Sequence, residues 1–112
     1  ALQDGVVETE SIADGLAGRV EDGSITIPLV RKYVDELILV SEEEIEQSIV
    51  YAWEKHGEII EGSAAVSLAA VLAGKVTDRP AVSILTGGNI QPEYHRMLAR
   101  IWAGISREGS QE

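Results

Sequence analysis

The chain has 112 residues, of which 45% are hydrophobic and 25% are charged, and its formal net charge is −10. This length fits one domain at most. The absence of Cys excludes disulfides, thiol catalysis and cysteine metal clusters, and two His argue against a histidine zinc site within one chain. The negative charge argues against nucleic acid and anionic membranes as partners, because both would repel the chain.

The chain shows no pattern of membrane insertion or secretion. Its longest apolar stretch, residues 64–73, is far shorter than the roughly 20 residues that span a bilayer. The N-terminal stretch ALQDGVVETE is acidic and lacks the cationic start of a secretory signal. We therefore expect a cytoplasmic protein.

The first third of the chain predicts an irregular segment, a helix and a strand. Residues 1–24 contain four glycines and little periodicity, which indicates an irregular leading segment. Pro28 then suits a first helical turn. The apolar face of this helix is expected to consist of Leu29, Val30, Tyr33 and Val34. The run ELILV at 36–40 is nearly all apolar, which is typical of a buried parallel strand.

A second helix is predicted to begin after Ser41 and to end at Gly57. Ser41 and Glu44 have the spacing of a capping box. Further glutamates crowd the first turns, at 42, 43 and 46, where the helix dipole favours negative charge. An acidic metal site is the alternative interpretation of this glutamate run, and capping is the preferred one.

The rest of the chain predicts a helix, a strand and a final helix. The stretch EGSAAVSLAAVLAGKV is a helix that is apolar almost all round, which is typical of a helix inside a larger protein. AVSILT at 81–86 is a second apolar strand, and an amphipathic helix follows Pro92. We therefore predict an α/β fold over residues 25–106, a partial parallel sheet of about two strands covered by helices, with a disordered tail at 107–112. Two strands are too few for a complete sheet.

The stretch ILTGGNI at 84–90 is the strongest candidate for a binding site. A strand–Gly–Gly–helix junction places backbone N–H groups where an anion or a ring edge could bind. The alternative is a tight turn whose glycines permit a positive φ. TGGN matches neither of the common phosphate-binding glycine motifs.

Four segments together resemble a known enzyme family. SIADGLAG, YVDELILVSEEEIEQSI, EGSAAVSLAAVLAGKV and ILTGGNI are similar, in order and spacing, to segments of the threonine/serine dehydratases. These are pyridoxal-phosphate enzymes of the tryptophan synthase β-like fold, a family that includes serine racemase. The resemblance runs from about Ser11 to Ile90, and it implies the C-terminal part of such a catalytic domain.

The resemblance also implies a set of cofactor contacts. Thr86 stands where the family usually has a serine, whose hydroxyl meets the pyridine nitrogen of pyridoxal phosphate. Gly87 and Gly88 would form the turn that lets the backbone close around the ring. Glu61 would lie near the ring, although a role as helix N-cap explains it equally well.

Two parts of the family's site have no counterpart here. The family's Schiff-base lysine lies in a Ser-Phe-Lys segment, and its phosphate cup is a run of glycines; this chain has no Phe and no such run. The divalent-metal residues of serine racemase-like members lie upstream of the matched region. Lys32, Lys55 and Lys75 stand in helical or charged contexts that do not suit a nucleophile. We expect no catalytic residue, no metal site and no pyridoxal phosphate bound by this chain alone.

The sequence supports three hypotheses for the function. The first is a C-terminal fragment of a pyridoxal-phosphate dehydratase, which needs the missing N-terminal part of the enzyme. The second is a stand-alone oligomeric interaction module derived from such a fragment. The third is a small-molecule binder that uses the TGGN loop. In either of the first two cases exposed apolar surfaces predict a partner, either a second copy of the chain or the missing part.

Overall fold

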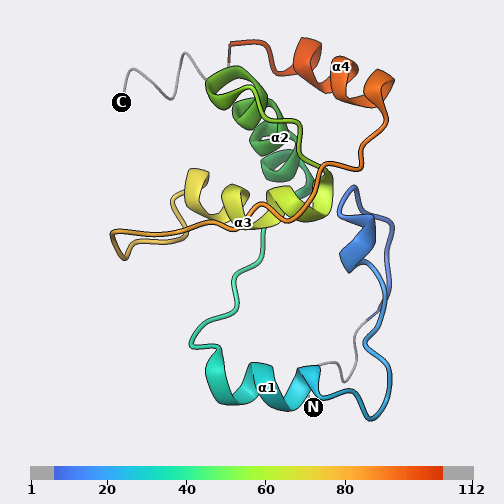
Figure 1. Ribbon diagram of the computed structural model, residues 1–112, viewed down its shortest axis with the longest axis vertical. Helices are drawn as coiled ribbons and strands as arrows, with labels where there is room; N and C mark the ends of the chain where they lie inside the picture. The colour runs from blue at the N-terminus through green and yellow to red at the C-terminus, as the bar shows by residue number, and fades with distance from the viewer. Residues whose placement is uncertain (1–6, 105–112) are drawn as a thin grey trace.

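The computed structural model describes residues 7–104 (Figure 1). This part of the chain contains a short 3-10 helix, η1 (Asp14–Leu16), and four α-helices: α1 (Thr26–Tyr33), α2 (Glu42–His56), α3 (Gly62–Leu72) and α4 (Pro92–Ile101). Helices α2, α3 and α4 gather at one end of the molecule, and α1 lies apart at the other end (Figure 1). Within residues 7–104, α1 contacts no other helix.

Helix α2 begins and ends as its sequence predicts. The backbone N–H of Glu44 donates to Ser41 Oγ at 3.1 Å, and the N–H of Ser41 donates to Glu44 Oε1 at 2.7 Å. This reciprocal pair satisfies two N–H groups that the first turn leaves without partners. Gly57 ends the helix with φ at 65°, a conformation that favours glycine. The capping interpretation of the glutamate run is therefore confirmed.

The core lies between α2 and α3. Ala64, Ala65 and Ala69 of α3 are almost completely buried, and their small side chains let the two helices approach closely. Ile49 of α2 and Leu98 of α4 are both fully buried in the same cluster. Burying one such side chain is worth about 1.5–3 kcal/mol. Helix α2 is therefore the central helix of this core, since α3 and α4 both pack against it.

Lys75 joins the end of α3 to the start of α2. Its ammonium group donates to Glu44 Oε1 at 2.8 Å and to the carbonyl of Leu39 at 2.8 Å. The Lys75 ammonium is the largest of the causes that hold the pKa of Glu44 below its usual value. The contact fixes the residues that precede α2 against the loop that follows α3.

The predicted parallel sheet is wrong for the part of the chain that the structure describes, because residues 7–104 contain no β-strand. Both apolar runs, 36–40 and 81–86, lack regular structure. A strand exists through hydrogen bonds to a neighbouring strand, and neither run has such a neighbour here. Most of their large side chains are exposed, namely Leu37, Leu39, Val82, Ile84 and Leu85. The expected tail at 107–112 lies outside the described residues.

Helix α4 packs a histidine against α2. His95 is only 7% exposed, and its ring lies 5.6 Å from the Trp53 ring in an edge-to-face arrangement. Burial lowers the pKa of His95 below its ordinary value of 6.5, because the charged imidazole loses its solvation. A lowered pKa means that the folded chain favours neutral His95. The stability that His95 contributes is therefore present above pH 6.5 and is lost as the pH falls through the lowered pKa.

We predict that the free energy of unfolding decreases between about pH 7.5 and about pH 5.5, where His titrates and carboxylates remain ionised. His95→Gln should reduce this decrease, since it removes the buried titrating group. Urea unfolding at the two pH values measures it. His56→Gln is the matched control, because His56 is exposed at the end of α2 and its loss should leave the decrease unchanged. Equal pH dependence in His95→Gln and the unaltered chain would contradict the prediction.

Candidate functional site

Glu61 and the Gly87–Gly88 segment, far apart in the sequence, lie against each other. The backbone N–H of Glu61 donates to the Gly87 carbonyl at 3.1 Å. Glu61 Oε1 accepts a hydrogen bond from the backbone N–H of Asn89 at 3.4 Å. Glu61 does occupy the N-cap position of α3, but its side chain makes no capping hydrogen bond. The carboxylate therefore orders the glycine segment instead of capping the helix.

Space, and not backbone conformation, restricts the side chain at both glycines, and it does so most strictly at Gly88. A Cβ atom on Gly88 would lie 2.5 Å from the carbonyl oxygen of Ile59, and one on Gly87 would collide with Glu61 Oε1. Neither glycine has a positive φ, unlike Gly23, Gly57, Gly74 and Gly104. The alternative interpretation, a tight turn whose glycines have a positive φ, is therefore wrong. They allow the 87–88 backbone to approach the segment before α3 closely.

Thr86 precedes the glycines and is exposed. The residues before it are held along α3, since Ser67 Oγ donates to the Ile84 carbonyl at 3.0 Å and lies 2.7 Å from Ser83 Oγ. Thr86 thus stands at the end of an anchored segment, with its side chain open to a binding partner. Its hydroxyl can both donate and accept a hydrogen bond.

A cavity of about 350 Å³ takes in Glu61 but none of Thr86, Gly87 and Gly88. Asn89 of the candidate TGGN stretch and Tyr94, which sequence reasoning did not assign to a site, line it together with Glu61. Burial raises the pKa of Tyr94, and the carboxylates of Glu46 and Glu42 raise it further. Asn89 belongs to the TGGN motif, whereas the only sequence signal at Tyr94 is the amphipathic stripe after Pro92. Of the four predicted contacts, only Glu61 therefore lines this cavity.

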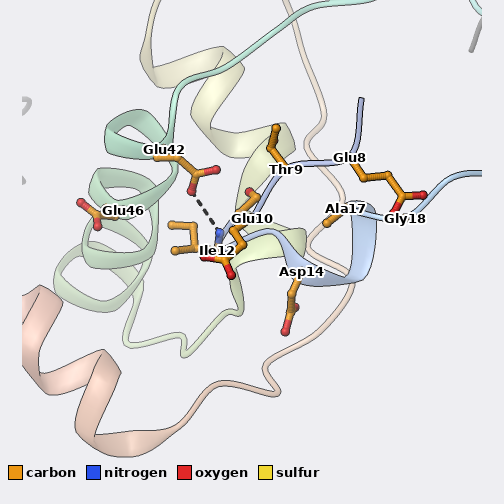
Figure 2. Close-up of a pocket in the computed structure, with 10 residues that line it drawn as sticks. Glu8, Thr9, Glu10, Ile12, Asp14, Ala17, Gly18, Glu42 and Glu46 are labelled. Carbon is orange, nitrogen blue, oxygen red and sulfur yellow. Dashed lines mark hydrogen bonds between the residues drawn. The ribbon is translucent and has the colours of Figure 1, made fainter. Parts of the chain in front are cut away.

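A larger cavity, of about 860 Å³, lies between the N-terminal segment and α2 (Figure 2). Five carboxylates line it, from Glu8, Glu10, Asp14, Glu42 and Glu46. Glu42 Oε2 accepts a hydrogen bond from the backbone N–H of Ile12 at 3.0 Å, drawn as a dashed line in Figure 2. Such a lining disfavours a phosphate group because like charges repel. Within residues 7–104 no three acidic or histidine side chains are grouped closely enough to hold a metal ion.

We predict that Gly88→Ala lowers the free energy of unfolding by about 1–3 kcal/mol, because the new methyl group overlaps the fixed carbonyl of Ile59. Gly87→Ala should cost less, since the end of the flexible Glu61 side chain can move aside. Urea unfolding measures both losses. Gly18→Ala serves as the control, because a Cβ there meets nothing within 4 Å. Equal losses at the two glycines of the pair would show that the close approach to Ile59 is not the constraint.

Comparisons with known proteins identify the family. The family described as "Pyridoxal-phosphate dependent enzyme" matches residues 2–87 of the chain. The L-threonine ammonia-lyase of Geobacter sulfurreducens is 45% identical over 84 residues, which cover 73% of this chain and 21% of that protein. The serine racemase of Dictyostelium discoideum is 39% identical over 84 residues, which cover 71% of this chain and 25% of that protein.

A solved structure agrees with these sequence relatives. The crystal structure of the Dictyostelium discoideum serine racemase resembles this chain with a TM-score of 0.65 and 36% sequence identity. The match covers 80% of this chain and 30% of that one, so the chain spans less than a third of the proteins it resembles. The chain belongs to the family of pyridoxal-phosphate dependent enzymes.

Proposed function

We propose that the chain is the C-terminal part of the catalytic domain of a threonine/serine dehydratase that works in the cytoplasm. Such an enzyme eliminates water from serine or threonine and releases a 2-oxo acid and ammonia. The observation that carries the proposal is 45% identity with an L-threonine ammonia-lyase over 84 residues. No helix in residues 7–104 is long and apolar enough to cross a membrane.

The residues at the glycine segment fit one edge of a flat cofactor ring. Gly87 and Gly88 keep the backbone free of side chains, and Thr86 offers an exposed hydroxyl beside them. Thr86 would bind the ring nitrogen, and Glu61 would hold the segment in place through Asn89. Pyridoxal phosphate, when bound, supplies the electron sink for the elimination. A neutral hydroxyl beside the ring nitrogen, unlike a carboxylate, would not hold that nitrogen in its protonated form.

Residues 7–104, which contain all three lysines of the chain, offer no lysine suited to the covalent step, and Lys55 is exposed near the end of α2. Lys75 is held by Glu44 and the Leu39 carbonyl, and Lys32 lies 5.2 Å from the centre of the Tyr33 ring. Neither lysine is desolvated beside the glycine segment, as a nucleophile would be. The cofactor-binding lysine and the phosphate-binding glycines would come from the missing N-terminal part. We propose that the chain binds no pyridoxal phosphate without that part.

The proposal includes a partner for the apolar surfaces. The chain exposes 8187 Å², whereas a compact monomer of 12.0 kDa exposes about 6,000 Å². Its radius of gyration is 15.2 Å, above the ~13 Å of a compact domain of similar length. This excess surface supports an association with the missing N-terminal part or with a second copy of the chain.

A stand-alone oligomeric module is the second candidate. The exposed apolar runs at 36–40 and 81–86 favour it as much as they favour the dehydratase fragment. The two candidates predict different effects of adding the missing part. A fragment regains dehydratase activity when the rest of the enzyme is supplied, whereas a module does not. An open reading frame that continues upstream into a Ser-Phe-Lys segment would favour the fragment.

We predict that the isolated chain releases no 2-oxo acid from serine or threonine above the rate of free pyridoxal phosphate. Loss of a covalent catalytic group costs several orders of magnitude, on the scale of about 10⁴–10⁶. A coupled assay for 2-oxo acid measures the release, with and without the N-terminal part. Turnover by the isolated chain would contradict its proposed dependence on that part. Failure of the reconstituted enzyme would contradict the assignment as a dehydratase fragment.

In the full-length or reconstituted enzyme, we predict that Thr86→Ala lowers kcat about two- to tenfold, the worth of one neutral hydrogen bond. Thr86→Ser should remain close to the unaltered enzyme because it keeps the hydroxyl. Steady-state kinetics measures both variants. Thr77→Ala is the matched control, an exposed threonine away from the glycine segment. Full activity in Thr86→Ala would remove this residue from the proposed site.

We predict that the isolated chain forms a dimer or higher oligomer at micromolar concentration, because its apolar runs lack cover. Ile84→Glu should shift it towards monomer by placing a charge on the 81–86 run. Ile101→Glu is the control, since it adds the same charge at a comparably exposed position on α4. Light scattering after size exclusion gives the mass. A compact monomer of 12.0 kDa would rule out self-association.

A further inference from the structure

A separate cavity lies between α2, the segment before α3, and α4. Its volume is about 470 Å³, within the range of about 300–1,000 Å³ that is usual for small-molecule sites. Trp53, Ile59, Ile90 and Ala99 give it apolar walls. Gly88 also lines it, whereas Glu61, Thr86 and Gly87 do not, so the cavity adjoins the proposed cofactor contact and shares one residue with it.

One polar atom at this cavity lacks a partner. The His95 side chain lines the cavity and is 7% exposed, and its Nε2 is buried without a hydrogen bond. Buried polar groups in folded proteins nearly always have a partner, so an exception requires an explanation. A ligand atom that hydrogen-bonds to Nε2 would satisfy it. The lowered pKa of His95 leaves the imidazole neutral at pH 7, so one ring nitrogen can donate and the other can accept.

Arg96 supplies positive charge at the rim of the same cavity. Its guanidinium lies 3.7 Å from Glu93 Oε1, and both side chains are largely exposed, at 63% and 79%. An exposed ion pair at this distance is weak, so an incoming anion can compete for the guanidinium. Arginine binds carboxylates through two parallel N–H donors. The polar side of the cavity therefore suits one carboxylate.

We propose that this cavity binds a small aromatic monocarboxylate. The aromatic ring would lie against Trp53 and Ala99, and the carboxylate would accept hydrogen bonds from Arg96 and from His95 Nε2. Aromatic rings pack favourably on an indole, and the apolar walls exclude water from the ring. The proposal concerns this chain's own residues and does not depend on a bound cofactor or on dehydratase activity.

The test uses the 112-residue chain and benzoate as the probe, at about 0.15 M salt to screen the net charge. The indole N–H signals of the two tryptophans are followed by nuclear magnetic resonance. The Trp53 signal should shift and saturate with a Kd of about 1 mM, as expected for so small a ligand. Trp102 is the internal reference, because its indole donates to Glu46 at 3.2 Å and lies outside the cavity. Its signal should not move.

Variants then separate the contributions of ring and charge. Arg96→Gln should weaken benzoate binding about tenfold, and so should His95→Phe, which keeps a ring but lacks Nε2. Arg100→Gln, one turn further along α4 and outside the cavity, should bind as the unaltered chain does. Ala99→Phe should abolish binding, since the new ring fills the cavity. Benzyl alcohol, which lacks the carboxylate, should bind at least about tenfold more weakly than benzoate.

Several results would overturn the proposal. Absence of a saturable Trp53 shift would show that the cavity takes no such ligand. Equal affinity for benzyl alcohol and benzoate, or unchanged binding in Arg96→Gln, would exclude a carboxylate as the recognised group. Unchanged binding in Ala99→Phe would place benzoate elsewhere. Because Arg96 and Arg100 are both exposed, their exchange for Gln leaves the folded chain available for the comparison.

Discussion

The close approach of α3 to α2 is the constraint on which the rest of this structure depends. Small buried side chains such as Ala65 and Ala69 allow it. At the start of α3, Gly62 allows a second close approach, because an added methyl group there would collide with the Ile12 carbonyl of the N-terminal segment. Each segment of interest is then attached to α3. Glu61 stands at its start, Ser67 holds the 81–86 run along its side, and Lys75 joins its end to α2. The glycine segment can be positioned without a sheet because α3 positions it.

The helices could be predicted from the sequence, because the signals that start and stop a helix are local. Ser41 and Glu44 are three residues apart, and Gly57 permits the conformation that ends α2. The strands could not be predicted reliably, because an apolar run indicates only that its side chains will be covered. Whether residues 36–40 and 81–86 form a ladder depends on neighbouring strands, and residues 7–104 contain none. The α/β prediction is therefore wrong for the described chain.

In the candidate site, too, the sequence could predict features with a local cause but not those that depend on distant residues. The sequence directed attention to the glycine pair and to Glu61, and the structure brings them together. The sequence could not show why position 88 needs a glycine, because the Ile59 carbonyl that excludes a Cβ there lies nearly thirty positions earlier. The sequence did not indicate His95 at all. A histidine among the residues of α4 has no sequence pattern that separates a buried, unpartnered imidazole from an exposed one.

The two ends of the molecule differ in how many stabilising contacts they make within the described chain. Helix α1 has no buried residue and touches no other helix of the described chain, whereas α2, α3 and α4 share a core. Local unfolding free energies are lowest where few apolar contacts are buried. The segment around α1 should therefore open far more readily than the three helices that share the core. A partner that covers its apolar side chains would order this segment and leave the Glu61–Gly88 region largely unchanged. Association with a partner and the shape of the glycine segment would then depend on different parts of one short chain.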